Sequence, residues 1–370
     1  MRIGIDAREL LGRRTGVGRY LAELCAEWRQ RSATGPDQFV LYAPAAGQSP
    51  AVLGPPFDHP SPGPFQYRAV PGAGGSWWEQ TDLAAAINLD PPDVFFAPAY
   101  SAPLRVRVPV VVTVHDISFE THPEWFSWRE GLRRRLLTRQ SARRATEVIA
   151  VSGFTRDELV AHLGLPPARV SVVWSGIHRP VERHDDRVRE PLVLFVGSIF
   201  NRRHLPELIQ AFALVASERP AARLVLVGDN RSHPPQDPAR LAARAGVADQ
   251  VDVRAYVEEA ELADLYARAM VFVFLSEYEG FGLPPLEAMA AGVPTLVGDT
   301  PVARELYGDG ARRVPVHDVR AIATAITTLL EDADARTSLA AAAAARLPLF
   351  TWPRAAADTL AVLERAGHGR

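Results

Sequence analysis

Hydrophobic and polar positions along the chain alternate in a way that predicts short strands separated by longer helices. Uninterrupted runs of β-branched and aromatic residues are typical of buried parallel strands. We expect strands at residues 2–5, 94–96, 110–114, 148–151, 170–173, 192–196, 224–227, 251–255, 271–275 and 295–297. We expect helices at residues 18–30, 132–144, 155–163, 205–217, 238–245, 259–267 and 285–290. Repeated strand–helix alternation predicts an α/β fold in which helices cover parallel sheets.

The alternation is interrupted once, over residues 178–191, where the sequence HRPVERHDDRVREP is charged and has no hydrophobic period. We interpret this stretch as a linker, because a chain of 370 residues suggests two domains. The expected domains are residues 1–180 and 181–349. In sheets of this kind ligands bind beyond the carboxyl ends of the strands, so the cleft between two such domains is the expected active site.

The composition excludes several kinds of chemistry. All 41 basic residues counted as Lys+Arg are arginine, so the chain cannot form a lysine Schiff base, anchor pyridoxal phosphate or supply a Walker-type lysine. The net charge of −2 does not suit a nucleic-acid-binding protein. Cys25 is the one cysteine, which excludes an intrachain disulfide, and we expect it to be a small buried hydrophobic residue.

The N-terminal sequence MRIGIDAREL indicates the compartment. Charges at Asp6, Arg8 and Glu9 interrupt its apolar stretch too early for a signal peptide. The most apolar run, residues 106–114, contains Arg107 and is far shorter than the roughly 20 residues that a membrane span needs. The sequence therefore predicts a cytoplasmic protein.

The segment 276–292, SEYEGFGLPPLEAMAAG, carries the clearest candidate chemistry. It follows a predicted strand and leads through a glycine loop, containing Gly280, into a helix. Free backbone amides at the start of this helix would form an anion site, and glycine allows close approach of the backbone to a ligand. The residues that would supply these amides are Phe281, Gly282 and Leu283.

Two carboxylates belong to the same segment. Glu279 lies in the loop, and we place Glu287 in the first helical turn. Both could accept hydrogen bonds from the hydroxyls of a sugar or ribose. The alternative is that Glu287 only complements the helix dipole while Glu279 is a solvated charge.

A second candidate segment, GSIFNRRH, begins at Gly197 directly after a predicted strand. Arg202 and Arg203 stand just before the next helix, where two guanidinium groups beside free amides would suit a pyrophosphate. A solvated basic turn is the alternative.

Two weaker candidates lie in the first half. Gly16 and Gly18 belong to a predicted loop after the first strand, but this loop lacks the third glycine of the dinucleotide fingerprint. His115 and Asp116 directly follow the strand at 110–114, at the carboxyl edge of its sheet. They are either site residues or a structural pair.

Together these segments resemble glycosyltransferase family 4, whose members are retaining enzymes with the GT-B fold of two facing Rossmann-like domains and an active site in the interdomain cleft. Glu279 and Glu287 match the family's E-x7-E pair, its most specific mark. Arg202-Arg203 stand where the family usually has Arg-Lys, and His115-Asp116 match its His-Asp. Further similar segments are TGVGRY at 15–20, SWWEQ at 76–80, DVFFAPAY at 93–100, VVTVHDISFETHPEWF at 111–126, residues 151–177 and residues 195–212.

The resemblance implies a role for each site residue. The donor would be a nucleotide sugar, used as a co-substrate with no other cofactor. Glu287 would bind ribose hydroxyls, Glu279 the transferred sugar, and the arginine pair the pyrophosphate. The remaining donor-site positions are Tyr256 and Val257 beside the base, His115 with Asp116 near the donor sugar, and Gly16 with Gly18 over the phosphates. The family's last helix would place residues 350–370 with the first domain.

Catalysis of such a reaction depends on stabilising the charge that develops on the leaving group. Negative charge gathers on the diphosphate as its bond to the anomeric carbon breaks, and arginines and helix N-termini oppose that charge. No metal is needed in principle, and we expect no metal site, because the paired aspartates at 185–186 and at 332 and 334 lack a site context. Three departures from the family are Arg203 for lysine, His204 for asparagine and His178 for aspartate.

The resemblance implies that the acceptor is a hydroxyl on a glycan, a lipid-linked sugar or a small natural product. A segment with Trp125 and Trp128 is followed by seven arginines between residues 129 and 144. This segment is either a basic, aromatic-edged face for the inner membrane surface or for an anionic lipid-linked acceptor, or a solvated helix beside core aromatics. The sequence leaves open the oligomeric state, the base and the donor sugar, for which mannose, rhamnose, glucose and N-acetylglucosamine are all conceivable. The alternative function is non-catalytic nucleotide-sugar binding on the same fold.

Overall fold

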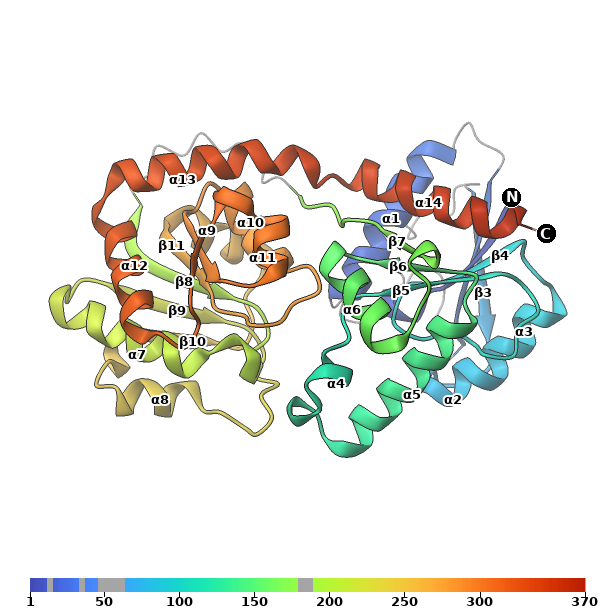
Figure 1. Ribbon diagram of the computed structural model, residues 1–370, viewed down its shortest axis with the longest axis horizontal. Helices are drawn as coiled ribbons and strands as arrows, with labels where there is room; N and C mark the ends of the chain where they lie inside the picture. Colours follow the sequence, from blue (N-terminus) through green and yellow to red (C-terminus); the bar gives the residue numbers. More distant parts are fainter. Residues whose placement is uncertain (12–15, 33–36, 46–63, 179–188, 370) are drawn as a thin grey trace. The chain divides into compact units, whose positions relative to one another are not determined.

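The computed structural model describes residues 1–11, 16–32, 37–45, 64–178 and 189–369. These residues divide into two compact units (Figure 1). The first unit comprises Met1–Thr121, Trp128–Gly176 and Trp352–Arg370, and the second comprises His122–Ser127 and Ile177–Thr351. Each unit is a parallel sheet with helices in its crossovers, which confirms the predicted α/β class.

The first unit contains, within the described residues, a seven-stranded sheet in the order β3-β2-β1-β4-β5-β6-β7. Every neighbouring pair is parallel. All five residues of β5 are buried, which is why this strand appears in the sequence as an unbroken apolar run. The strands are β1 Arg2–Asp6, β2 Gln38–Pro44, β3 Phe65–Val70, β4 Val94–Ala97, β5 Val110–Val114, β6 Glu147–Ala150 and β7 Val170–Val172. The helices are α1 Gly16–Ser32, α2 Gly75–Trp78, α3 Ala84–Leu89, α4 Ser118–Thr121, α5 Trp128–Arg144, α6 Gly153–Leu163 and the C-terminal α14 Trp352–His368.

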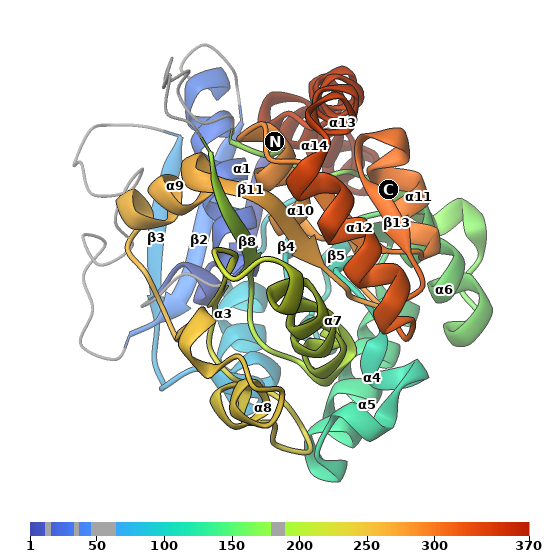
Figure 2. The same cartoon turned by 90° about the vertical axis from the view of Figure 1, so that its left-hand side faces the viewer.

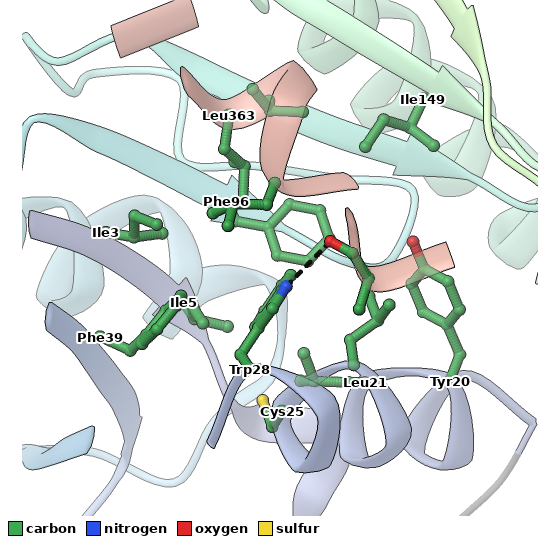
Figure 3. Close-up of a cluster of buried hydrophobic side chains, with 14 of the residues drawn as sticks. Ile3, Ile5, Tyr20, Leu21, Cys25, Trp28, Phe39, Phe96, Ile149 and Leu363 are labelled. Atoms are coloured by element: carbon green, nitrogen blue, oxygen red, sulfur yellow. Dashed lines mark hydrogen bonds between the residues drawn. The ribbon is translucent and has the colours of Figure 1, made fainter. Parts of the chain in front are cut away.

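The core of the first unit lies where α1 and α14 pack together over the sheet (Figure 3). Trp28 of α1 stacks on Phe39 of β2, with ring centroids 5.2 Å apart and planes 6° apart. Its indole Nε1 donates a hydrogen bond to the carbonyl oxygen of Ala356 in α14, at 3.0 Å. Cys25 is fully buried in the same cluster, as the sequence predicted. The last helix of the chain therefore completes the core of the first unit.

The second unit contains, in the part of the chain that is described, a six-stranded parallel sheet in the order β10-β9-β8-β11-β12-β13. Its strands are β8 Glu190–Val196, β9 Arg223–Val227, β10 Val251–Arg254, β11 Ala269–Phe274, β12 Thr295–Gly298 and β13 Arg312–Val314. Its helices are α7 Leu205–Glu218, α8 Pro238–Arg244, α9 Glu259–Arg268, α10 Leu283–Ala290, α11 Pro301–Leu306, α12 Val319–Glu331 and α13 Ala333–Arg346. Helices α7 and α12 lie side by side (Figure 2). Of the predicted linker, residues 179–188 lie outside the described residues, and Glu190 and Pro191 open strand β8.

Candidate active site

The centre of the candidate site is the turn after β8. Gly197 directly follows the strand, a 3₁₀ turn spans Asn201–Arg203, and His204 adopts a left-handed conformation with φ 48° before α7. The Arg203 side chain folds back under Gly197, where a Cβ would lie 2.5 Å from its Nη1. Gly197 also has φ 137°, so only glycine combines this backbone with room for the guanidinium.

Arg203 and Glu279 form the central ion pair. Glu279 follows the neighbouring strand β11, and its Oε1 lies 3.0 Å from Arg203 Nε and 2.9 Å from Nη2. Ser276 Oγ donates to the same carboxylate at 2.9 Å, and Arg202 Nη2 lies 3.6 Å from its Oε2. Arg203 Nη1 also donates to the Ser198 carbonyl at 2.6 Å. Both arginines are buried, so the turn after β8 and the loop after β11 are joined by charged groups removed from water.

Burial and charge compete in setting the pKa values of these groups. Burial alone would raise the pKa of the Glu279 carboxyl, but the adjacent guanidinium groups of Arg203 and Arg202 outweigh it and lower that pKa. Burial lowers the pKa of Arg203 despite the attraction of Glu279. Since an arginine starts from a pKa above about 12, the site contains an ionised carboxylate held by cations at neutral pH.

Tyr307 holds the glycine loop by hydrogen bonds, a role that the sequence analysis did not predict. Its hydroxyl donates to the carbonyl oxygens of Phe281 at 3.3 Å and Gly282 at 3.0 Å. Gly282 has φ 82°, and a Cβ there would lie 2.1 Å from the Tyr307 hydroxyl oxygen. Burial and the nearby Glu279 carboxylate raise the pKa of Tyr307, so it remains a hydrogen-bond donor. The loop that precedes α10 is thus held with its amides at the helix start.

Glu287 lies in the second turn of α10, and its predicted position in the first turn is wrong. The helix begins at Leu283, with Pro284 and Pro285 occupying its first turn. Proline suits these positions because the first amides of a helix need no intrahelical partner. Glu287 is partly exposed, so its carboxylate is accessible on the helix. The sequence-based alternative, a first-turn partner of the helix dipole, therefore does not apply.

Tyr256 and Val257 follow β10, the edge strand of the second sheet. Val257 is buried, whereas Tyr256 is exposed and its hydroxyl donates to the Glu258 carboxylate at 3.3 Å.

His115 and Asp116 belong to the first unit, directly after β5. His115 Nε2 donates to the Pro98 carbonyl at 2.8 Å, and its ring packs edge-on against Tyr20 with centroids 5.1 Å apart. Burial lowers the pKa of His115 despite the Pro98 carbonyl and Asp116, so the imidazole is neutral near pH 7. Asp116 accepts hydrogen bonds from the Ser118 amide at 2.9 Å and the Ser118 hydroxyl at 2.8 Å.

Gly16 and Gly18 are in the first turn of α1, not in the loop that the sequence predicted. Residues 12–15 before them lie outside the described residues. Open space surrounds the Cβ position of Gly16, and glycine is tolerated in a first turn because the amides there are not yet committed to helical bonds. These glycines therefore contribute a helix start rather than a phosphate loop.

A buried charged group in the first unit was also missed by sequence reasoning. Arg8 Nη2 lies 2.7 Å from Asp6 Oδ2 and 2.8 Å from Glu79 Oε2. Ser101 donates to Glu79 at 2.8 Å. Asp6 ends β1 and Glu79 comes from the SWWEQ segment, so the pairing of two distant segments escaped the sequence pattern.

Two family models match consecutive parts of the chain. The model described as "Glycosyltransferase Family 4" matches residues 14–179, and "Glycosyl transferases group 1" matches residues 180–346. The chain belongs to glycosyltransferase family 4. The meeting point of the two models coincides with the passage from the first sheet to the second.

Curated relatives of this family 4 chain are named for different glycosyl transfers. O-antigen chain mannosyltransferase B of Escherichia coli is 27% identical over 278 residues, which are 72% of this chain and 73% of that protein. D-inositol 3-phosphate glycosyltransferase of Streptomyces scabiei is 35% identical over 250 residues, which are 62% of this chain and 56% of that protein. The match thus spans less than two thirds of the second relative.

Among solved structures, Anabaena HepE in complex with UDP and glucose matches with a TM-score of 0.75 at 20% identity, over 98% of this chain and all of that one. This likeness shows that the family 4 chain has the GT-B fold. In the described residues, no helix combines the length and the apolar character that crossing a membrane requires.

Proposed function

We propose that this protein transfers a hexose-type sugar from a nucleotide-sugar donor to a hydroxyl acceptor, with retention of anomeric configuration and without a catalytic metal or further cofactor. The observation that carries the proposal is the buried group of Arg202, Arg203 and Glu279. It lies at the carboxyl ends of β8 and β11, neighbouring strands of one parallel sheet, where ligands of such sheets bind.

The reaction breaks the bond between the anomeric carbon and the diphosphate oxygen, and negative charge moves onto the diphosphate. Arg202 and the amides at the start of α10 would oppose that charge without reorganising, since the loop is already held by Tyr307. Arg203, with three of its nitrogens engaged, would act mainly by keeping Glu279 ionised and aligned for the sugar hydroxyls.

The other residues take their roles from the match to family 4. Glu287 would accept from the ribose hydroxyls, and the backbone at Tyr256 and Val257 would flank the base. In the first unit, the neutral imidazole of His115, with Asp116 beside it, would face the donor sugar. The helix start at Gly16 and Gly18 would approach the phosphates.

The named relatives favour turnover over non-catalytic binding. Two of them are named for glycosyl transfer, to an O-antigen chain and to inositol phosphate. HepE is recorded with UDP and glucose and with UDP-glucose, which supports a nucleotide-sugar donor here.

We propose a lipid-linked acceptor met at a membrane surface, because α5 carries an exposed apolar stripe. Trp128, Leu132 and Leu136 are 71%, 43% and 55% exposed, and their four-residue spacing puts them on one face. The exposed Arg129 and Arg133 flank this stripe, as expected for a helix lying on an anionic lipid surface.

The proposed function is tested in two steps. A thermal-shift screen of uridine, guanosine and adenosine diphosphates and their sugars should give one donor a clear rise in melting temperature. A ligand at 100 times its dissociation constant adds about 2.7 kcal/mol. With that donor and an acceptor, nuclear magnetic resonance of the product should show the donor's anomeric configuration.

Two matched carboxamide variants separate the assigned roles. Glu279→Gln should reduce transfer at least 100-fold while nucleotide binding persists, and Glu287→Gln should mainly weaken nucleoside diphosphate affinity. Full transfer by a folded Glu279→Gln protein, or no donor that stabilises the wild type, would overturn the proposed function.

A further inference from the structure

A cluster of two histidines and two glutamates lies beside the candidate site in the second unit. We call His204, Glu207, Glu277 and His317 the histidine–glutamate cluster. His204 and Glu207 come from the start of α7, Glu277 from the loop after β11, and His317 from the turn between β13 and α12. None of the four was singled out as a ligand by its sequence context, because they come from three separate segments.

The cluster is ordered so that each histidine lies between both glutamates. Glu277 Oε2 is 3.2 Å from Nε2 of His204 and 3.9 Å from Nε2 of His317. Glu207 Oε1 faces the other ring nitrogens, 3.4 Å from Nδ1 of His204 and 3.9 Å from Nδ1 of His317. The two rings meet edge to face, with centroids 4.6 Å apart. Both Nε2 atoms and one Glu277 oxygen thus converge, while Glu207 lies behind the rings.

This arrangement matches a known feature of protein metal sites. A histidine that ligates a metal usually donates its other ring N–H to a carboxylate, which fixes the ring orientation. Glu207 Oε1 is within hydrogen-bond distance of Nδ1 of His204 and faces Nδ1 of His317 at 3.9 Å. We propose that His204 Nε2, His317 Nε2 and the Glu277 carboxylate bind one divalent transition-metal cation such as Zn²⁺, with Glu207 as the orienting carboxylate.

The distances and burial support a site that is nearly formed. One ligand atom from each of His204, Glu277 and His317 lies within 4.8 Å of the others. Tetrahedral zinc with bonds of about 2.1 Å places its ligand atoms about 3.4 Å apart. His204 and Glu277 already have this spacing, and the exposed side chain of His317 can close the remaining gap by rotation.

The state of His204 Nε2 is a second observation. This atom is buried and makes no hydrogen bond, although the Glu277 carboxylate is close by. Such a contact is expected when the His204 nitrogen and the Glu277 carboxylate both point at one metal position rather than at each other. The cation would neutralise the two carboxylates and join the start of α7 to the loop that carries Glu279, leaving water in its open positions. The site takes no part in the proposed leaving-group chemistry.

The competing explanation is a proton in place of the cation. Burial would lower the pKa of the His204 imidazole, but the Glu207 and Glu277 carboxylates outweigh it and raise the pKa to about 9. A protonated His204 between two carboxylates would also balance their charge. The two explanations differ in whether the folded protein binds a metal with one-to-one stoichiometry.

The test is metal binding by tag-free, chelator-treated full-length protein. Zn²⁺ titrated in a calorimeter should bind saturably with one equivalent per chain, and Co²⁺ should give the visible absorption of a histidine-ligated ion. His317→Ala, which removes an exposed ligand and should fold, should weaken binding at least tenfold. Glu207→Gln should weaken it about 10- to 100-fold.

The matched control is His162→Ala. His162 is also exposed and lies 3.5 Å from a glutamate, Glu158, on α6. This variant should bind Zn²⁺ as tightly as the wild type. Absence of saturable Zn²⁺ binding, or equal affinity in wild type and His317→Ala, overturns the metal site and leaves the protonated His204. The readout needs no donor or acceptor, so it is independent of the proposed function.

Discussion

The absence of lysine from the chain affects the candidate site at Arg203, where the family usually has a lysine. Its guanidinium uses Nε and Nη2 on Glu279 and Nη1 on the Ser198 carbonyl. Its carbon Cζ also lies 4.6 Å from the centre of the Phe274 ring. A planar, three-nitrogen group can satisfy all these contacts together, whereas a lysine ammonium is a compact charge on a flexible stem. The arginine is therefore built into this site.

We expect Arg203→Lys to be a disruptive substitution. The ammonium cannot bridge Glu279 and Ser198 and also cover the Phe274 ring. The buried Glu279 carboxylate therefore loses part of the hydrogen bonding and charge pairing that stabilise it. The melting temperature should fall, and transfer should drop at least tenfold. Differential scanning fluorimetry and steady-state kinetics with the identified donor measure the two effects.

The control for this substitution is Arg156→Lys. Arg156 also faces a carboxylate, Asp157, but on the surface, where ion pairs contribute about 0–1 kcal/mol. It should leave both quantities unchanged. If Arg203→Lys also retained wild-type stability and rate, positive charge alone would be sufficient at this position.

At the scale of elements, buried strands were the features that the sequence predicted best. The runs that became β5, β8 and β11 are almost wholly apolar, so burial on both faces is visible in their composition. The strands β2, β3 and β13 were not predicted. β3, FQYRAV, is an edge strand with polar residues among apolar ones, and such a strand has neither an apolar run nor a strict alternation.

The residues of the candidate site also divide into those that the sequence could predict and those that it could not. Glu279 and Arg203 could be singled out because each lies in the segment between a predicted strand and the next helix, and neighbouring parallel strands end at the same edge. Tyr307 and Ser198 could not, since their contacts depend on how the loops after the strands fold back. Glu287 lies one turn further into its helix than predicted, because the helix starts at Leu283 rather than at Pro285.

Helix α5 gives the prediction that belongs to this scale. Replacing Trp128, Leu132 and Leu136 together by serine removes the exposed apolar stripe without touching the buried face of the helix. Binding of the protein to vesicles containing anionic phospholipid should fall at least tenfold, and wild-type binding should weaken with added salt. Vesicle sedimentation measures both.

The matched control replaces three exposed apolar residues elsewhere by serine, namely Leu89, Leu214 and Val253. This triple variant should bind vesicles like the wild type. Equal loss in both triple variants would show general hydrophobic adhesion, and no vesicle binding by the wild type would remove the membrane from the proposed acceptor chemistry.

At the scale of the whole molecule, two of the points at which the chain passes between its units lie next to each other. The first unit ends at Gly176 and resumes at Trp352. A Cβ on Gly176 would lie 2.3 Å from the Trp352 backbone nitrogen, so glycine allows the two segments to touch. One residue further, the Ile177 amide donates to the Phe350 carbonyl at 3.3 Å. The C-terminal helix α14 therefore begins next to the residue at which the chain leaves the first unit.

This arrangement predicts that a destabilising substitution in α14 weakens the first unit, whose strands are far from α14 in the sequence. Leu363 is fully buried against the core formed with α1, and Leu→Ala at such a position costs about 2–5 kcal/mol. In Leu363→Ala, hydrogen-exchange protection should fall at least tenfold in peptides from β1 and β4, while peptides from β8 and β9 keep theirs. Glu364→Ala, an exposed neighbour on the same helix, should change neither set. Loss of protection in β8 and β9, or in both sheets equally, would mean that the last helix stabilises the second unit or the whole chain instead.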